Sequence, residues 1–183
     1  MSGMSHHVDQ ALARLDTSGD DRLDRLFRLL EIPSISTDPD YKADCKRAAK
    51  LLSEELSELG FDSRLVPTEV HPMVLAHKEA ASPDTPHVLF YGHYDVQPVD
   101  PLDLWDDDPF APALLKREDG TQYIRARGAS DAKGQVRTFI EACRAWIEAT
   151  GSLPCGVTVF LEGEEESGSP SMPRFLADYG DEL

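Results

Sequence analysis

A histidine and an aspartate follow an apolar run in the segment 88–98, which reads VLFYGHYDVQP. The run has the composition of a buried strand and breaks at Gly92, so His93 and Asp95 come at the carboxyl end of that strand. Residues two apart on a strand face the same side, which places the two side chains next to each other. A metal-binding imidazole commonly has a carboxylate on its other ring nitrogen, and this pair could form such a couple. A hydrogen-bonded loop pair without a metal is the alternative.

Two further strand-to-loop junctions carry carboxylates. The segment 127–134, RGASDAKG, contains Asp131, and the segment 162–169, EGEEESGS, contains three consecutive glutamates after the apolar run VTVFL. Chemistry in α/β sheets usually gathers at the carboxyl ends of strands, and carboxylates packed together there repel each other unless a cation lies between them. The pattern therefore predicts a cation site. Its ligand types suit a two-metal hydrolase, in which one carboxylate bridges two ions and a free carboxylate deprotonates the attacking water.

Each motif also has a simpler interpretation. GASDAKG contains the residue types of a phosphate-binding loop but lacks the G-x-x-x-x-G-K-[ST] spacing. EGEEE could be a charged, solvated turn, although it directly follows an apolar strand and is closed by Ser-Gly-Ser. Ser130 and Ser167 could act as nucleophiles, but no G-x-S-x-G elbow is present. We therefore favour metal chemistry.

The charge balance limits the partners of the protein. Its 183 residues include 34 acidic and 18 basic ones, and the formal charge of −16 disfavours nucleic acid and anionic membrane surfaces. The first ten residues, MSGMSHHVDQ, lack an apolar signal region, and no run reaches the ~18 apolar residues of a membrane span. We therefore expect a cytoplasmic protein without a membrane partner. Cys45, Cys143 and Cys155 show no CxxC spacing and are predicted to be reduced thiols.

The periodicity of the chain predicts an α/β layered fold. Apolar positions at helical spacing predict helices over 9–31, 45–59, 136–150 and 171–179. Short apolar runs predict strands over 61–66, 73–76, 88–92, 123–126 and 157–161. Loops are expected at 34–41, 80–86 and 99–115, the last one ordered but irregular. Where a helix intervenes between two strands, we expect the strands to pair in parallel.

The motifs, in this order, resemble those of the M20 family of metallopeptidases, and particularly its dipeptidase and carboxypeptidase-like branch. The resemblance rests on GHYDVQP, WDDDPFAP, RGASDAKGQ and EGEEESGS and extends from Leu23 to Leu183. Four ordered motifs are far more specific than any one of them. The resemblance implies the layered helix/sheet/helix catalytic domain of the zinc aminopeptidase and carboxypeptidase type.

The resemblance also implies roles for individual residues. His93 and Glu166 would be metal ligands, and Asp131 would bridge two metal ions. Zinc is expected, and manganese or cobalt also suit ligands of these types. Asp95 would steady the His93 ring from behind, and Glu165 would be the general base.

Two departures from the family pattern bear on this assignment. Ala132 stands where the family usually has a second aspartate, at a position that is not a ligand, and the Asp131–Ala132 peptide bond is expected to be cis as in relatives. The chain also stops at Leu183, before the family's remaining ligands and its lid or dimerisation domain. We therefore expect 1–183 to be a truncated, N-terminal part of a catalytic domain whose full-length form is a homodimer. Glu164 lies outside the implied set.

The function implied is that of a two-metal hydrolase. A metal-bound hydroxide would attack the carbonyl of a dipeptide or a C-terminal peptide bond, with Glu165 as the base, and the DVQP and W-x-x-x-PF segments favour a dipeptidase. A deacylase of N-acyl amino acids, of the acetylornithine or succinyl-diaminopimelate type, shares the metal chemistry and is an alternative. A catalytically silent fragment is another. Because part of the ligand set would be missing, we expect the 183-residue chain alone to be inactive.

Overall fold

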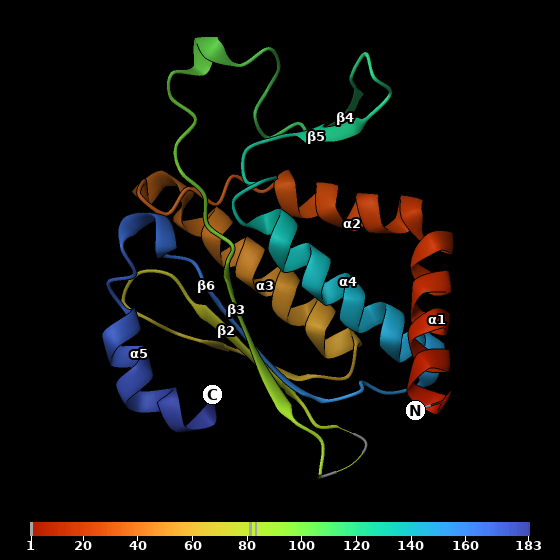
Figure 1. Cartoon of the computed structure of the whole chain (residues 1–183). Coiled ribbons are helices and arrows are strands. Elements are labelled where there is room, and N and C mark those ends of the chain that lie inside the picture. Colours follow the sequence, from red (N-terminus) through yellow and green to blue (C-terminus); the bar gives the residue numbers. More distant parts are fainter. Residues whose placement is uncertain (1, 81, 83) are drawn as a thin grey trace.

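The computed structural model describes residues 2–80, 82 and 84–183 (Figure 1). The helices in this part of the chain are α1 (Ser2–Thr17), α2 (Gly19–Leu30), α3 (Lys42–Glu58), α4 (Lys133–Thr150) and α5 (Met172–Tyr179). The strands are β1 (Asp62–Val66), β2 (Met73–Lys78), β3 (His87–His93), β4 (Ala113–Lys116), β5 (Gln122–Arg125) and β6 (Gly156–Glu162). Short 3-10 turns lie at Pro39–Tyr41, Leu102–Leu104, Glu165–Ser167 and Gly180–Glu182.

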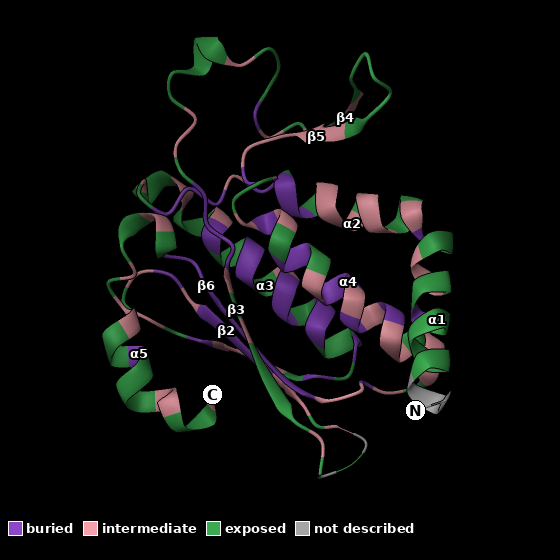
Figure 2. Cartoon of the chain, viewed as in Figure 1, coloured by how far each residue is buried: buried purple, intermediate pink, exposed green. Residues whose placement is uncertain are grey.

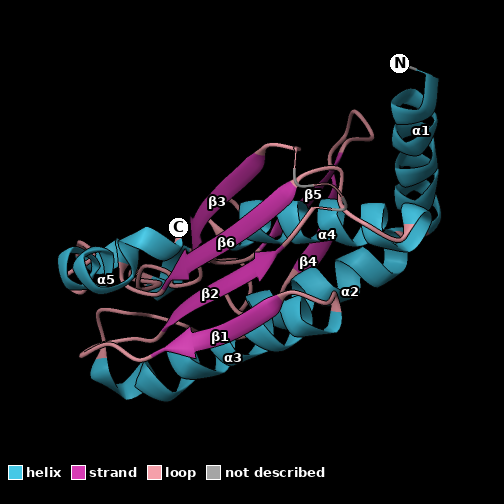
Figure 3. Ribbon diagram, turned by 90° about the horizontal axis from the view of Figure 1, so that it is seen from below, coloured by secondary structure: helices cyan, strands magenta, loops and turns pink. Residues whose placement is uncertain are grey.

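Four of the strands form one mixed sheet in the order β1-β2-β6-β3 (Figure 3). β2 pairs antiparallel with both β1 and β6, whereas β3 runs parallel to β6. Helix α4 lies between β3 and β6 along the chain, and parallel neighbours need such a crossover. Because the two strands are parallel, their carboxyl ends meet at the same end of the sheet, where His93 is in register with Glu162.

The two faces of the sheet are covered unequally (Figure 3). Helices α3 and α4 pack on one face through a large apolar core that includes Leu52, Ile140 and Val159. On the other face the short helix α5 contributes Phe175, whose ring stacks on that of Phe160 with the centroids 4.6 Å apart. This helix/sheet/helix arrangement confirms the predicted layered α/β fold.

Strand β3 is the edge strand next to β6, and much of it is exposed (Figure 2). Val88, Leu89 and Tyr91 are 41%, 47% and 48% exposed. The prediction of a buried strand is therefore wrong for these residues. Leu89 and Tyr91 lie on the face that α5 covers only in part, and Val88 lies on the opposite face. All three stay exposed because no strand of the described chain pairs with the free edge of β3.

The helix predicted over 9–31 is two helices. α1 ends at Thr17, Ser18 leaves the helical conformation with φ −110° and ψ 22°, and α2 starts at Gly19. Thr-Ser-Gly combines residues of modest to poor helix propensity, which makes this the weakest point of the segment. The chain changes direction there (Figure 1), so that both helices reach α4.

Residues 97–127 form an arm that projects from the body (Figure 1). The arm contains the predicted irregular loop, but β4 and β5 pair antiparallel at its end, and the sequence predicts only β5. Trp105 anchors the irregular part: its Nε1 donates a hydrogen bond to the carbonyl oxygen of Val99 at 3.1 Å, and the Arg127 guanidinium lies 5.3 Å from the ring centroid. The loop is thus ordered by side-chain contacts and not by repeating backbone structure.

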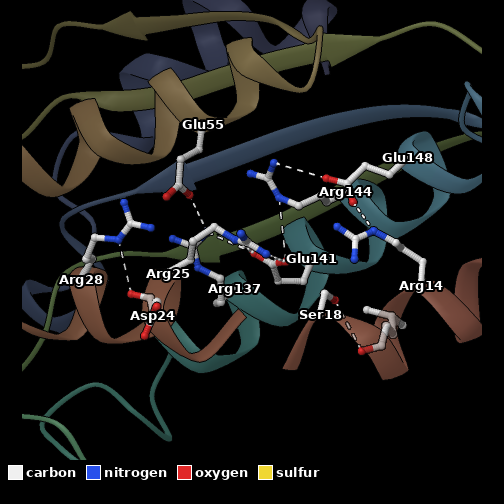
Figure 4. Close-up of polar contacts among 11 residues, drawn as sticks. Arg14, Ser18, Asp24, Arg25, Arg28, Glu55, Arg137, Glu141, Arg144 and Glu148 are labelled. Atoms are coloured by element: carbon white, nitrogen blue, oxygen red, sulfur yellow. Dashed lines mark hydrogen bonds and ion pairs between the residues drawn. The ribbon is translucent and has the colours of Figure 1, made fainter. Parts of the chain in front are cut away.

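A buried ion-pair cluster joins the helices behind the sheet (Figure 4). Arg25 of α2 donates two hydrogen bonds of 2.7 Å to Glu141 of α4, and Arg137 of α4 binds Glu55 of α3. Arg137 and Glu141 are 2% and 5% exposed, a degree of burial that charged side chains tolerate only in pairs. Further pairs extend the cluster to α1: Arg144–Glu141, Arg144–Glu148 and Arg14–Glu148.

The cysteines are free thiols, which agrees with the predicted reduced state. Cys45 and Cys143 are buried in the core on α3 and α4, and Cys155 is half-buried. Among the residues that the structure describes, no helix combines the length and the apolar composition needed to cross a bilayer.

Candidate metal centre

The end of β3 carries the first pair of candidate site residues. His93 is 6% exposed and Asp95 is fully buried. Nδ1 of His93 lies 3.3 Å from Oδ1 of Asp95 and 3.2 Å from the Asp95 carbonyl oxygen. Gly92 is needed just before them, because a Cβ there would meet a methyl carbon of Val136 at 2.8 Å. With Nδ1 occupied by Asp95, Nε2 of His93 is the ring nitrogen that faces the other site residues.

Asp131 is presented by a tight turn between β5 and α4. The Asp131–Ala132 peptide bond is cis, which confirms the prediction. Gly134 lies directly against the carbonyl oxygen of Ala129, so this position has no room for a side chain. The Asp131 side chain is 75% exposed, and its Oδ1 lies 3.0 Å from Nε2 of His93. The turn therefore brings a largely solvent-facing carboxylate to a buried imidazole.

The third group of candidate site residues follows β6 in the 3-10 turn Glu165–Ser167. Gly168 ends this turn with φ +86°, a conformation that glycine adopts without strain. The backbone N–H of Glu166 donates to Oδ2 of Asp95 at 3.0 Å, and Nε2 of Gln97 donates to Oε2 of Glu166 at 2.8 Å. These bonds tie the turn directly to the segment that follows β3.

The three predicted metal ligands converge in space. His93, Asp131 and Glu166 each offer one ligand atom, and these atoms lie within 4.8 Å of one another. No other group of three or more His, Cys, Asp or Glu side chains in the described ranges has this spacing. Oε2 of Glu165 lies 3.9 Å from Nε2 of His93, and its side chain is 45% exposed. The predicted base therefore borders the cluster and is open to solvent.

The remaining glutamate of the run, Glu164, is engaged elsewhere. It is fully buried, and its Oε1 accepts hydrogen bonds of 3.0 Å from the N–H of His71 and from Oγ1 of Thr68. Its Oε2 accepts a hydrogen bond of 2.9 Å from the N–H of Ser171. A carboxylate with these partners holds the surrounding loops together.

The electrostatics of the site are dominated by carboxylates around one imidazole. Burial lowers the pKa of His93, but nearby carboxylates raise it by more, to about 9. These carboxylates belong to Asp95, Asp131 and Glu165. Burial also raises the pKa of Glu162 at the end of β6. The carboxylates therefore favour a positive charge at the position of the imidazole.

The arrangement fits a divalent cation. One imidazole nitrogen and carboxylate oxygens are donors that suit zinc, and also manganese or cobalt. Oδ1 of Asp95 is buried and has no hydrogen-bond partner of good geometry among the described residues. It is therefore placed to accept a hydrogen bond from Nδ1 of His93 when Nε2 binds a metal.

Two buried polar residues beside the site, one of them inside the RGASDAKGQ motif, have no role in the assignment made from the sequence. Lys133 and Ser34 are fully buried, and burial lowers the pKa of Lys133 to about 7. A signal for Lys133 exists in the sequence, because it precedes Val136 and Ile140 by three and seven residues and so shares their buried face of α4. Ser34 begins the predicted polar loop 34–41. Residues 34–38 lie outside the helices and strands, as predicted, and the first three residues of this loop are buried.

Comparison with known proteins identifies the family. The model of Peptidase family M20/M25/M40 matches residues 89–182, which run from β3 into the last residues of the chain and include the three candidate junctions. The chain belongs to this family, as the resemblance of its motifs indicates.

Individual relatives agree with this assignment. The chain is 29% identical, over 94% of its length, to the Cys-Gly metallodipeptidase DUG1 of Saccharomyces cerevisiae, and it superposes on the solved Dug1p structure with a TM-score of 0.82. The structure of human carnosine dipeptidase 1 gives a TM-score of 0.83 at 28% identity over 94% of this chain. The succinyl-diaminopimelate desuccinylase of Bordetella parapertussis is 31% identical over 79% of the chain. The chain spans 38%, 38% and 34% of these three proteins, little more than a third of their length.

Proposed function

We propose that this chain carries the metal-ligating and proton-transferring residues of an M20-type metallopeptidase that hydrolyses dipeptides. The observation that carries the proposal is the convergence of His93, Asp131 and Glu166, whose ligand atoms lie within 4.8 Å of one another near the carboxyl ends of β3 and β6. We further propose that residues 1–183 form the N-terminal part of the catalytic domain. The homodimer implied by the resemblance stays a prediction for the full-length protein.

Each site residue has a distinct task in this proposal. His93 and Glu166 would be ligands to divalent ions, and Asp131 would be a ligand shared by both ions. Zinc, when bound, supplies a Lewis acid that polarises the scissile carbonyl and lowers the pKa of the attacking water. Glu165 accepts the proton of that water and passes it to the leaving amine, a role that its position beside the cluster and its exposure support. Asp95 holds the His93 ring and its tautomer.

The names of the relatives suggest the substrates. DUG1 is a Cys-Gly dipeptidase, and Beta-Ala-His dipeptidase of Rattus norvegicus is 33% identical over 80% of this chain. We therefore expect small dipeptides of these kinds to be the substrates of the whole protein. The desuccinylase relative supports the second candidate, an N-acyl amino acid deacylase, because the same metal chemistry would cleave either amide.

Zinc titration of the purified chain by calorimetry tests the metal centre. Asp131→Asn keeps the size of the side chain and removes its charge, so we expect zinc affinity to fall by at least about tenfold, the smallest loss usual when only a group that supports a metal ligand is altered. Asp119→Asn, on the exposed turn between β4 and β5, is the matched control and should bind zinc like the unaltered chain. Equal zinc affinity in the chain and in Asp131→Asn would contradict the proposed centre.

Hydrolysis assays test the base. We expect the 183-residue chain to bind zinc without hydrolysing Cys-Gly or β-Ala-His, and zinc-dependent turnover that a chelator abolishes would show this expectation to be wrong. In a longer form of the protein that is active, Glu165→Ala should abolish turnover while zinc content stays unchanged. Unchanged turnover in that variant would exclude Glu165 as the base.

A further inference from the structure

The five residues 32–36, which we call the strap, connect α2 to the loop before α3 (Figure 1). Ser34, Ile35 and Ser36 are 0%, 3% and 7% exposed. Oγ of Ser34 has a hydrogen-bond partner, whereas Oγ of Ser36 is buried without one among the described residues. The strap contacts the segment after β3, the turn that presents Asp131, and His71, which is itself bonded to the turn after β6.

The first contact is with the segment that follows β3. Ile35 and Val96 form an isolated parallel bridge, and the N–H of Val96 donates to the carbonyl oxygen of Ser34 at 2.9 Å. Oγ of Ser34 donates to the carbonyl oxygen of Tyr94 at 2.7 Å. These contacts lie on both sides of Asp95, so the strap fixes the backbone from which the Asp95 carboxylate reaches His93.

The second contact is with the turn that presents Asp131. Nζ of Lys133 donates to the carbonyl oxygens of Ile32 at 2.6 Å and of Leu29 at 3.1 Å. Lys133 is the first residue of α4 and comes two residues after Asp131. Its aliphatic stem fills the space beside Gly128, where a Cβ would be 3.1 Å from Cδ of Lys133. The turn is thereby anchored to the strap by a buried side chain.

The third contact is with His71, which lies between β1 and β2 and links the strap to the turn after β6. Nε2 of His71 lies 3.0 Å from the carbonyl oxygen of Ser36, and it must donate, since a carbonyl can only accept. The backbone N–H of the same histidine donates to Oε1 of Glu164 at 3.0 Å. Because Glu164 directly precedes Glu165 and Glu166, the strap is linked through one histidine to the third junction.

We infer that the strap positions the candidate metal ligands, with Ser34 and Lys133 as positioning residues that act through Asp95 and Asp131. The inference rests on the proposed function, which supplies the metal. Two junctions distant in the sequence are hydrogen-bonded to the strap and the third is linked to it through His71, so loosening the strap lets the ligand atoms drift apart. A metal site needs its ligands within a few tenths of an ångström of their positions, and supporting contacts of this kind affect affinity strongly.

Titration of the purified 183-residue chain with Co²⁺ tests the inference, because the visible absorption of the ion reports both binding and ligand geometry. Ser34→Ala removes only the bond to Tyr94 and keeps the backbone contacts of the strap. We expect it to weaken Co²⁺ binding by about 5-fold or more and to change the absorption spectrum of the bound ion. Lys133→Met keeps the aliphatic stem and removes the ammonium group, and we expect a loss of at least about tenfold.

Ser53→Ala is the matched control. Oγ of Ser53 lies 2.9 Å from Oγ of Ser63 and joins α3 to β1, away from the three junctions, and Ser53 is 8% exposed. It loses a comparable buried hydrogen bond, so urea unfolding should show a similar loss of stability. Its Co²⁺ affinity and spectrum should match those of the unaltered chain.

The outcomes distinguish a failure of the inference about the strap from a failure of the proposed metal centre. Weaker binding and an altered spectrum in Ser34→Ala, with Ser53→Ala unchanged, support the inference. If Lys133→Met does not fold, Ser34→Ala decides the test. Co²⁺ binding by Ser34→Ala equal to that of the unaltered chain would overturn the inference. His93→Ala tests the proposed function separately. If His93→Ala binds Co²⁺ as tightly as the unaltered chain, the proposed centre is contradicted, and the role of the strap falls with it.

Discussion

At the scale of single residues, burial decides which side chains can react. Burial raises the pKa of the Cys45 and Cys143 thiols to about 12 each. Only the thiolate reacts readily with alkylating agents, so both side chains should be inert in the folded protein at ordinary pH. Burial also acts on His93 in the candidate site. It lowers the pKa of the imidazole, but the carboxylates around His93 raise that pKa by more.

Alkylation of the thiols as a function of pH tests whether Cys45 and Cys143 are inert in the folded protein. At pH 8 the two buried thiols stay protonated, whereas half-buried Cys155 can be reached by reagent. We expect iodoacetamide to modify Cys155 in the folded chain and to spare Cys45 and Cys143, with labelling of the buried pair rising only as the pH approaches 12. Peptide mass spectrometry reads each site, and unfolding in urea should make all three reactive at pH 8. Rapid labelling of Cys143 without urea would contradict the burial.

At the scale of elements, α4 connects the candidate site with the helices behind the sheet. Its first residue, Lys133, contacts the end of α2, and one turn further on Arg137 contacts Glu55 of α3 (Figure 4). Arg137 is 2% exposed, so its charge is stable there only because Glu55 and Glu141 lie close to it. The position of α4, and with it of the Asp131 turn, therefore depends on ion pairs as well as on apolar packing.

Removal of one partner of the buried pair should be strongly destabilising. Arg137→Met leaves Glu55 buried without its partner, and we expect the free energy of unfolding to fall by about 3–5 kcal/mol. The double variant Arg137→Met, Glu55→Met removes both charges and should recover most of that loss. Arg14→Met is the control, because Arg14 is 37% exposed in its pair with Glu148 and should contribute at most about 1 kcal/mol. Urea unfolding measures all three, and equal effects of Arg137→Met and Arg14→Met would count against the buried pair.

At the scale of the whole molecule, a strongly acidic surface coexists with an exposed strand edge. The net charge of −16 keeps copies of the chain apart, whereas β3 presents Val88, Leu89 and Tyr91 beside an edge with which no strand of the described residues pairs. Unpaired strand edges with exposed apolar residues favour pairing with other chains. Charge repulsion between molecules is screened at high ionic strength, so salt should shift the balance toward association.

Sedimentation at low and high salt measures how far the chain associates as charge repulsion is screened. We expect the chain to be mostly monomeric in low salt and to associate in a concentration-dependent manner when salt is raised. Leu89→Lys places a charge on the edge strand and should reduce association. Leu176→Lys on α5 is the control, because Leu176 is 46% exposed but lies on a helix without a free backbone edge. Association that responds equally to both substitutions would show that β3 is not the surface involved.

The sequence by itself determined the local elements and the identity of the candidate site residues. The periodicity of 45–59 and the glycine that follows it predict α3 and its end, and Gly60 indeed has φ +77°. The strand of 157–161 and the helix before it predict the parallel pairing of β6 with β3. These features are readable because the spacing of apolar residues, and glycine at helix ends, are local consequences of backbone geometry. The four motifs single out His93, Asp131 and the glutamates after β6 through their resemblance to those of the M20 family.

Only the tertiary structure decided how these residues are held. Ser34 and Tyr94 are 60 positions apart and Lys133 and Leu29 are 104 apart, yet each pair is joined by a hydrogen bond in the interior. A polar residue looks the same in the sequence whether it faces water or a buried carbonyl group, so a hydroxyl or an ammonium group predicts a loop or a surface until its distant partner is known. The break at Ser18 and the exposure of β3 depend in the same way on what packs against each element. Local patterns therefore determine which groups could do the chemistry, and through-space contacts determine where they are placed.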